Sequence, residues 1–172
     1  YAMANFEGVF GLYASHRYGY GAEDVGLIYT MIGLISTGVQ GLLTGPLTRL
    51  WGENRLIQIS LFASAVGFAL MLLAENYAAV LITVGFFVLS NAMLRPAISS
   101  EISKKADLGQ GTAMGLNNAF MSMGRIIGPL WAGYTFDINM NLPFISAAVI
   151  LLVTFFFSLR SHSPGVLEEA AS

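Results

Sequence analysis

The sequence contains few charged side chains and no cysteine. Only 10% of its 172 residues are Asp, Glu, Lys or Arg, whereas 55% are hydrophobic and the mean hydropathy is +0.67. Soluble domains usually carry about 25% charged residues, so this chain could not cover the surface of a soluble fold. The absence of cysteine excludes disulfides, thiolate metal sites and thiol catalysis. The composition therefore predicts an integral membrane chain.

Several functional classes lack the residues that they need. The formal net charge of −2 gives no reason to expect a nucleic-acid partner. His16 and His162 fall in predicted loops without neighbouring ligand residues, so we expect no metal site. An intramembrane protease of the rhomboid type requires a Gly-x-Ser-Gly nucleophile and a histidine inside the membrane, and neither is found. We therefore expect neither an enzyme nor a bound cofactor.

The sequence does contain six apolar stretches separated by short polar segments. A helix needs roughly 20 apolar residues to cross the hydrocarbon core. We predict an all-α integral membrane fold with six transmembrane helices, at about residues 1–18, 25–50, 56–74, 78–100, 111–136 and 142–159. Residues 161–172 form a polar tail that we expect to be disordered and cytoplasmic. Because the chain opens on Tyr1 inside an apolar run, we expect the first stretch to end a spanning helix of a longer polypeptide.

The basic residues favour one side of the predicted membrane topology. The loops after the second, fourth and sixth spans carry Arg49, Arg55, Lys104, Lys105 and Arg160. The loops on the other side carry only Arg17. The positive-inside rule therefore places both ends of the six-span unit in the cytoplasm, as expected for a multi-pass protein of the plasma (inner) membrane.

Small residues recur at helical spacing in two of the predicted spans. The second span carries Gly33, Thr37, Gly41 and Gly45 at intervals of four, which lets a neighbouring backbone approach closely. The fifth span carries comparable sets, Gly111/Gly115/Ala119 and Gly124/Gly128/Ala132. Pro129 lacks an amide hydrogen and is expected to kink this span, which membrane helices tolerate.

Three ionisable side chains lie inside apolar stretches. Glu7 belongs to the first span, Arg95 to the fourth and Arg125 to the fifth. A charged group at the bilayer centre costs roughly 2.5–3.5 kcal/mol on insertion scales, so such residues usually face a protein interior or a water-filled path. Arg125 is about 14 residues, or roughly 21 Å, into its span, which is too deep to reach headgroups easily. Arg95 lies nearer the cytoplasmic end, where reaching the headgroups is an alternative explanation.

Four segments resemble motifs of the major facilitator superfamily. GPLTRLWGENR (45–55) is similar to the family's G-x-L-a-D-r-x-G-r-k loop, although Arg49 stands in place of the acid. GRIIGPLWAG (124–133) resembles the G-x-x-x-G-P helix of the drug:proton antiporter branch. NFEGVFGLY (5–13) resembles the seventh helix of NorA-type multidrug exporters, and residues 94–137 resemble their tenth and eleventh helices.

The resemblance implies a fold and a function. The chain would be the C-terminal six-helix half-bundle, built from two inverted three-helix repeats, and substrate would bind near the midplane between the two halves. It would export lipophilic, often cationic, small molecules in exchange for protons by alternating access, with the proton gradient in place of a cofactor. Its partners would be the bilayer, the substrate and the N-terminal half or a second copy. A uniporter or symporter of a metabolite and a non-catalytic half-bundle are the alternatives.

The resemblance also suggests roles for individual residues. Glu7 matches the family's seventh-helix acid and is the candidate for proton coupling, with Arg95 as an ionic partner of Glu7 or of an acid in the other half. Some relatives carry an acid at the position of Ala92, so a second proton site is not expected here. Methionine and aromatic side chains suit an adaptable apolar site, although ordinary helix packing explains each of them as well. The predicted substrate contacts are Phe6, Phe10, Asn91, Asn117, Phe120, Met121 and Arg125, and the predicted conformational motif comprises Gly45, Leu47, Gly52, Gly124, Gly128 and Pro129.

Overall fold

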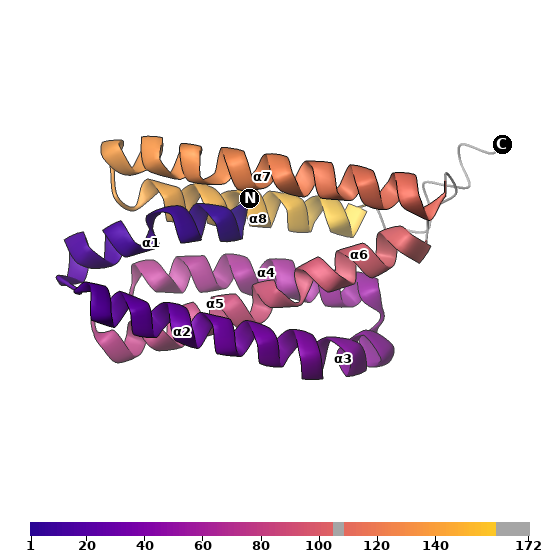
Figure 1. Cartoon of the computed structure of the whole chain (residues 1–172), viewed down its shortest axis with the longest axis horizontal. Helices are drawn as coiled ribbons and strands as arrows, with labels where there is room; N and C mark the ends of the chain where they lie inside the picture. The colour runs from indigo at the N-terminus through magenta and orange to yellow at the C-terminus, as the bar shows by residue number, and fades with distance from the viewer. Residues whose placement is uncertain (105–108, 161–172) are drawn as a thin grey trace.

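The computed structural model describes residues 1–104 and 109–160, which fold into helices joined by short turns (Figure 1). The helices run roughly side by side, and the N-terminus lies about half-way along the bundle (Figure 1). Lys105 and the predicted tail, 161–172, lie outside the described residues. The helices are α1 (Ala2–Tyr18), α2 (Ala22–Gly38), the π-helix η1 (Val39–Leu43), α3 (Thr44–Trp51), α4 (Glu53–Leu72), α5 (Tyr77–Ala92), α6 (Leu94–Lys104), α7 (Gln110–Ile138) and α8 (Leu142–Arg160).

Four helical runs among the described residues are long and apolar enough to cross a membrane. They are Ala22–Trp51, Glu53–Leu72, Tyr77–Lys104 and Leu142–Arg160. The first run joins α2, η1 and α3, and the third joins α5 and α6. Helix α1 has only 17 residues, and α7 carries many polar side chains along its 29 residues. The fold is thus all-helical with four candidate spans among the described residues. The other two of the six predicted spans correspond to α1 and α7.

Glycines end two of the helices. Gly19 follows α1 with a φ of 71°, a left-handed conformation that side-chain-bearing residues rarely adopt. Gly52, with a φ of 77°, is the single residue between α3 and α4, and its amide donates to the carbonyl of Thr48 (2.9 Å). The turn between these helices is therefore shorter than the gap, residues 51–55, between the second and third predicted spans.

Two of the long runs are interrupted at their interiors. Directly after η1, the backbone amide of Thr44 donates to the carbonyl of Val39 five residues earlier, which is the wider π pattern, and the Thr44 hydroxyl donates to the same oxygen (3.0 Å). The second interruption is at Met93, between α5 and α6. Val39 and Met93 pack in one small cluster with Leu56 and Ala97, separate from the main core. The two irregular segments therefore contact the same group of side chains.

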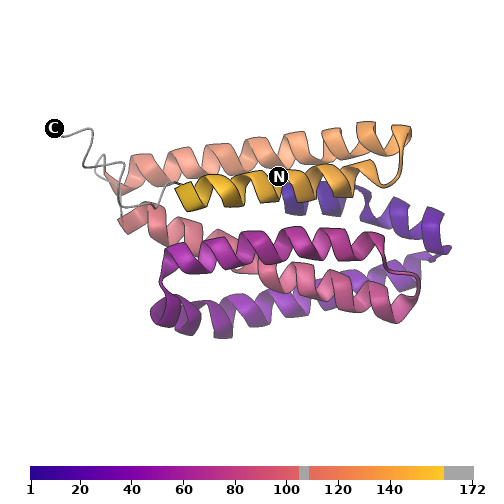
Figure 2. The ribbon, with the colours of Figure 1, turned by 180° about the vertical axis from the view of Figure 1, so that it is seen from behind.

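Aromatic rings fill the main core. Phe6 and Phe10 of α1 are stacked, with ring centroids 4.6 Å apart, and neither side chain is exposed. The rings of Phe68 and Phe87 join α4 to α5 at 4.3 Å. Figure 2, the opposite view, shows α4 and α8 side by side, and Phe144 of α8 reaches the same core. Phe6 and Phe10, which the sequence suggested as substrate contacts, are therefore packing residues inside this bundle.

Close backbone contacts join α1 to α7 and α4 to α5. A Cβ at Gly128 would lie 3.0 Å from the amide nitrogen of Asn5, and one at Gly8 would lie 3.1 Å from the Cα of Pro129. A Cβ at Gly67 would lie 2.9 Å from the Cα of Phe87. Real Cβ atoms essentially never come as close as the 2.9 Å at Gly67, and at Gly8 and Gly128 the facing helix would have to move by a few tenths of an ångström, so glycine suits both contacts.

Candidate functional site

Glu7 lies on the exposed side of α1, between α2 and α7. Its neighbour Gly8 contacts Pro129 of α7, and the hydroxyl of Tyr29 on α2 donates to the backbone carbonyl of Glu7 (3.2 Å). The side chain of Glu7 is exposed, whereas Phe6 and Phe10 on the other side of the helix are buried. The carboxylate therefore points out of the bundle rather than into its core.

Helix α7 exposes a polar stripe that contains Arg125. Asn118, Ser122 and Arg125 are spaced by four and three residues, so they share one face of the helix, and all three are exposed. Gly124 and Gly128, immediately beside this face, contact the first turn of α1. Ser122 was not among the residues predicted for the site, although its spacing from Arg125 could have identified it.

A second exposed stripe of α7 is apolar. It contains Leu116 (59% exposed), Phe120 (64%) and Ile127 (49%). At 3.6 residues per turn, Phe120 is rotated by about 140° from Arg125 around the helix axis. Phe120 and Arg125 therefore lie on different faces of α7, and that both contact one substrate stays a prediction. Apolar side chains on this face suit contact with lipid or with another apolar helix.

Asn117 and Met121 are half-buried at the edge of the α7 packing face. The side-chain nitrogen of Asn117 is buried and has no hydrogen-bond partner among the described residues. A buried amide group without a partner costs about 1–3 kcal/mol, so this position is a natural one for a polar ligand atom or a water molecule.

Arg95 and Asn91 lie on either side of the interruption at Met93. Arg95 is exposed in the first turn of α6, and Asn91 is half-buried at the end of α5. Among the described residues, no salt bridge joins Glu7 to Arg95 or to Arg125. The expected ion pair between Glu7 and Arg95 is thus not formed within this chain.

The residues of the loop motif meet α6 at one end of the bundle. Gly45 is exposed and a Cβ there would meet no atom within 4 Å, whereas Leu47 packs against the small cluster around Val39. Glu53, directly after Gly52, forms a salt bridge with Lys104, and the hydroxyl of Ser100 donates to the same carboxylate oxygen (3.0 Å). Sequence reasoning missed this contact, because Glu53 and Lys104 are 51 residues apart.

Metal-ligating groups do not gather in the part of the chain that the structure describes. No group of three His, Cys, Asp or Glu side chains in residues 1–104 and 109–160 could hold a metal ion. Nδ1 of His16 lies 2.9 Å from the carbonyl oxygen of Leu12, and its ring contacts Phe136. His162 lies outside the described residues.

Comparisons with known proteins agree with the sequence resemblance. A family model described as Major Facilitator Superfamily matches residues 1–171. Multidrug resistance protein 1 of Bacillus subtilis is 33% identical over 99% of this chain and 44% of its own length, and Multidrug resistance protein 2 is 31% identical over 89% and 38%. Quinolone resistance protein NorA of Staphylococcus aureus is 30% identical over 88% of this chain and 39% of its own length. The chain thus spans less than half the length of these relatives.

Proposed function

Because the chain belongs to the Major Facilitator Superfamily, we propose that it forms the C-terminal six-helix half of a transporter that exports lipophilic small molecules in exchange for protons. Substrate binds near the midplane between this half and an N-terminal half, and the site opens alternately to the two sides of the membrane. The positive-inside rule supports a cytoplasmic position for the ends of α3, α6 and α8 at the plasma membrane.

The observation that carries this proposal is the exposure of Glu7 and Arg125 on adjacent helices. Both side chains are exposed, although α1 and α7 contact each other through Gly8, Gly124 and Gly128. A charged group facing lipid tails costs roughly 2.5–3.5 kcal/mol at the bilayer centre. This side of the bundle therefore suits a water-lined passage rather than hydrocarbon.

The helical run of α2, η1 and α3 supplies a surface for the other half. Gly33, Gly41 and Gly45 would each accept a Cβ without meeting any atom within 4 Å, and the hydroxyl of Thr37 is satisfied by the carbonyl of Gly33 (2.8 Å). A stripe of small residues without unsatisfied donors suits close packing against another membrane helix. We assign that place to a helix of the N-terminal half.

The nature of the cargo is supported by the relatives. Two are named for multidrug resistance and one for quinolone resistance. In this chain Glu7 is the acid that takes up a proton when the passage opens outward and gives it up inside. Arg95, which forms no salt bridge with Glu7, pairs with an acid of the N-terminal half.

Replacing Glu7 tests the proton exchange. In the complete transporter reconstituted in liposomes, Glu7→Gln removes the titrating group without changing its shape, so proton release driven by tetraphenylphosphonium should be lost. Glu23→Gln, an exposed acid in the first turn of α2, is the matched control and should exchange normally. Unchanged exchange in Glu7→Gln would contradict the role of Glu7. Wild-type uptake of the cation without any proton flux would instead favour a uniporter.

A further inference from the structure

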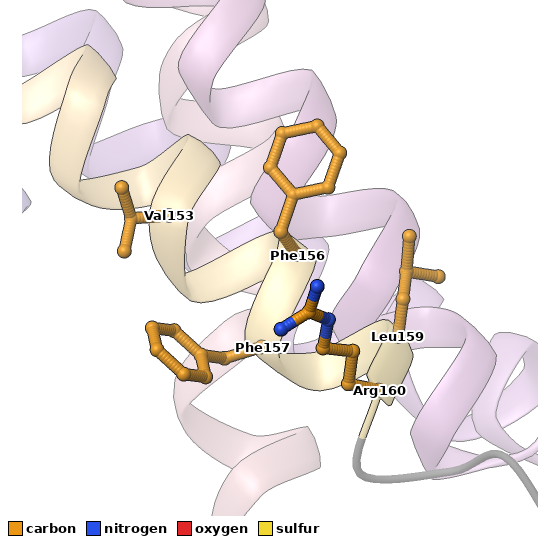
Figure 3. A pocket seen from close by; sticks show the side chains of 5 residues that line it. All are labelled: Val153, Phe156, Phe157, Leu159 and Arg160. Atoms are coloured by element: carbon orange, nitrogen blue, oxygen red, sulfur yellow. The ribbon is translucent and has the colours of Figure 1, made fainter.

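The last turns of α8 line an apolar hollow, and one of the lining side chains, that of Arg160, is cationic. The hollow has a volume of about 400 Å³ and is lined by Val153, Phe156, Phe157, Leu159 and Arg160. Phe156 is 61% exposed and Phe157 is 68% exposed. Figure 3 shows the guanidinium group of Arg160 turned back over the end of α8, towards these two rings. Arg160 is exposed, so the nitrogen-bound hydrogens of its guanidinium are available to a ligand beside these apolar side chains.

The hollow opens on the side of α8 that faces away from the bundle. Helix α8 is the most apolar of the four candidate spans, with a mean hydropathy of 2.4, yet only 22% of its most apolar window is buried. The remainder must be covered by hydrocarbon in a membrane. The hollow therefore lies where a lipid molecule, rather than a water-borne solute, reaches it.

The positive charge of the lining favours anionic lipids over zwitterionic ones. Arg160 is the only ionisable residue of the five, and it forms no salt bridge with a described residue. Guanidinium binds phosphate oxygens through two parallel hydrogen bonds, an arrangement that a phosphodiester headgroup can complete. A zwitterionic headgroup carries its own positive group, which is repelled by the guanidinium, so its binding is less favourable.

We propose that the end of α8 binds an anionic phospholipid. Its phosphate lies on Arg160, and the first methylene groups of one acyl chain lie against Phe156 and Phe157. The volume of the hollow accommodates this part of the lipid, and the rest of the chain extends along the exposed apolar side of α8. This site is independent of the proposed transport function, because none of its residues belongs to the exposed polar side of α1 and α7.

The test compares two arginines at the same end of the bundle. Arg49 of α3 is also exposed, but it does not line the hollow. The protein is placed in lipid nanodiscs, and the preference for spin-labelled phosphatidylglycerol over spin-labelled phosphatidylcholine is measured by electron paramagnetic resonance. One basic residue near an anionic surface is worth about 1 kcal/mol, or roughly a fivefold preference. Arg160→Gln should remove about this fivefold preference for phosphatidylglycerol, and Arg49→Gln should remove clearly less of it.

The outcomes distinguish a specific lipid site from non-specific electrostatic attraction of lipid to this end of the bundle. Equal losses in Arg160→Gln and Arg49→Gln would overturn the proposal, since any cation at this end would then serve. Phe157→Ala keeps the charge and removes an apolar wall, so it should reduce the immobilised fraction of both lipids, and an unchanged fraction also counts against the site. Displacement of the labelled phosphatidylglycerol by millimolar inorganic phosphate would reveal a soluble-anion site instead and would likewise overturn it. Circular dichroism of each variant establishes that the helices are intact.

Discussion

Two sets of glycines follow the same sequence pattern and have opposite surroundings. Gly124 and Gly128 of α7 allow the N-terminal end of α1 to approach so closely that an added Cβ would lie only 2.9–3.0 Å from its backbone. Gly33 and Gly41 of the α2 run meet nothing within 4 Å. Spacing by four residues therefore shows that a helix can be approached closely, but it does not show which helix approaches or whether that helix is in the same chain. The comparison divides the molecule into packed faces that determine its own fold and an open face available to a partner.

The packed face between α4 and α5 should be the most sensitive to substitution. In Gly67→Leu the new Cβ would lie 2.9 Å from the Cα of Phe87, and backbone cannot move aside as a flexible side chain can. Overpacking of a filled core costs about 1–3 kcal/mol and occasionally more, and we expect the upper end here. Thermal unfolding in detergent, followed by circular dichroism, measures the effect. A variant as stable as the wild-type protein would show that α4 and α5 are not packed as described.

The contact between α1 and α7 should respond in the same direction but less strongly. Gly128→Ala adds one methyl group 3.0 Å from the Cβ of Ala4 and from the amide nitrogen of Asn5. We expect a loss of about 1–2 kcal/mol, because α1 can shift outward along its exposed side. The same unfolding measurement applies, with Gly115→Ala as the control, since a Cβ at Gly115 meets nothing. Because Gly→Ala by itself favours the helix, Gly115→Ala should lose no stability, and equal losses in both variants would contradict the packing explanation.

The open face should tolerate substitution best. Gly33→Leu introduces a large side chain into empty space, so the free energy of unfolding of this chain should change by no more than about 0.5 kcal/mol. If the N-terminal half covers this stripe, the same variant should lower transport by the complete protein. Transport equal to wild type in Gly33→Leu would mean that another surface receives the partner helix.

Parts of the candidate site could be derived from the sequence, because charged residues are rare in apolar stretches and are therefore conspicuous there. Glu7 is notable in a chain with 10% charged residues, and the structure places it on the exposed side of α1. The stripe of Ser122 and Arg125 follows from helical spacing alone. In contrast, Phe6 and Phe10 flank Glu7 in sequence but lie in the core, since a helix turns adjacent residues about 100° apart. Which side faces the core depends on α4 and α5, and no local pattern around Glu7 contains that information.

The sequence by itself determined that this is a helical membrane protein of the Major Facilitator Superfamily. The physical reason is local, because a chain with so few charges must satisfy its backbone within its own helices once it is in lipid. Only the tertiary structure decided which glycines are packed, how η1 and Met93 come together, and that Glu53 binds Lys104. Each of these depends on two segments meeting in space, and the free energy of such a contact belongs to neither segment alone.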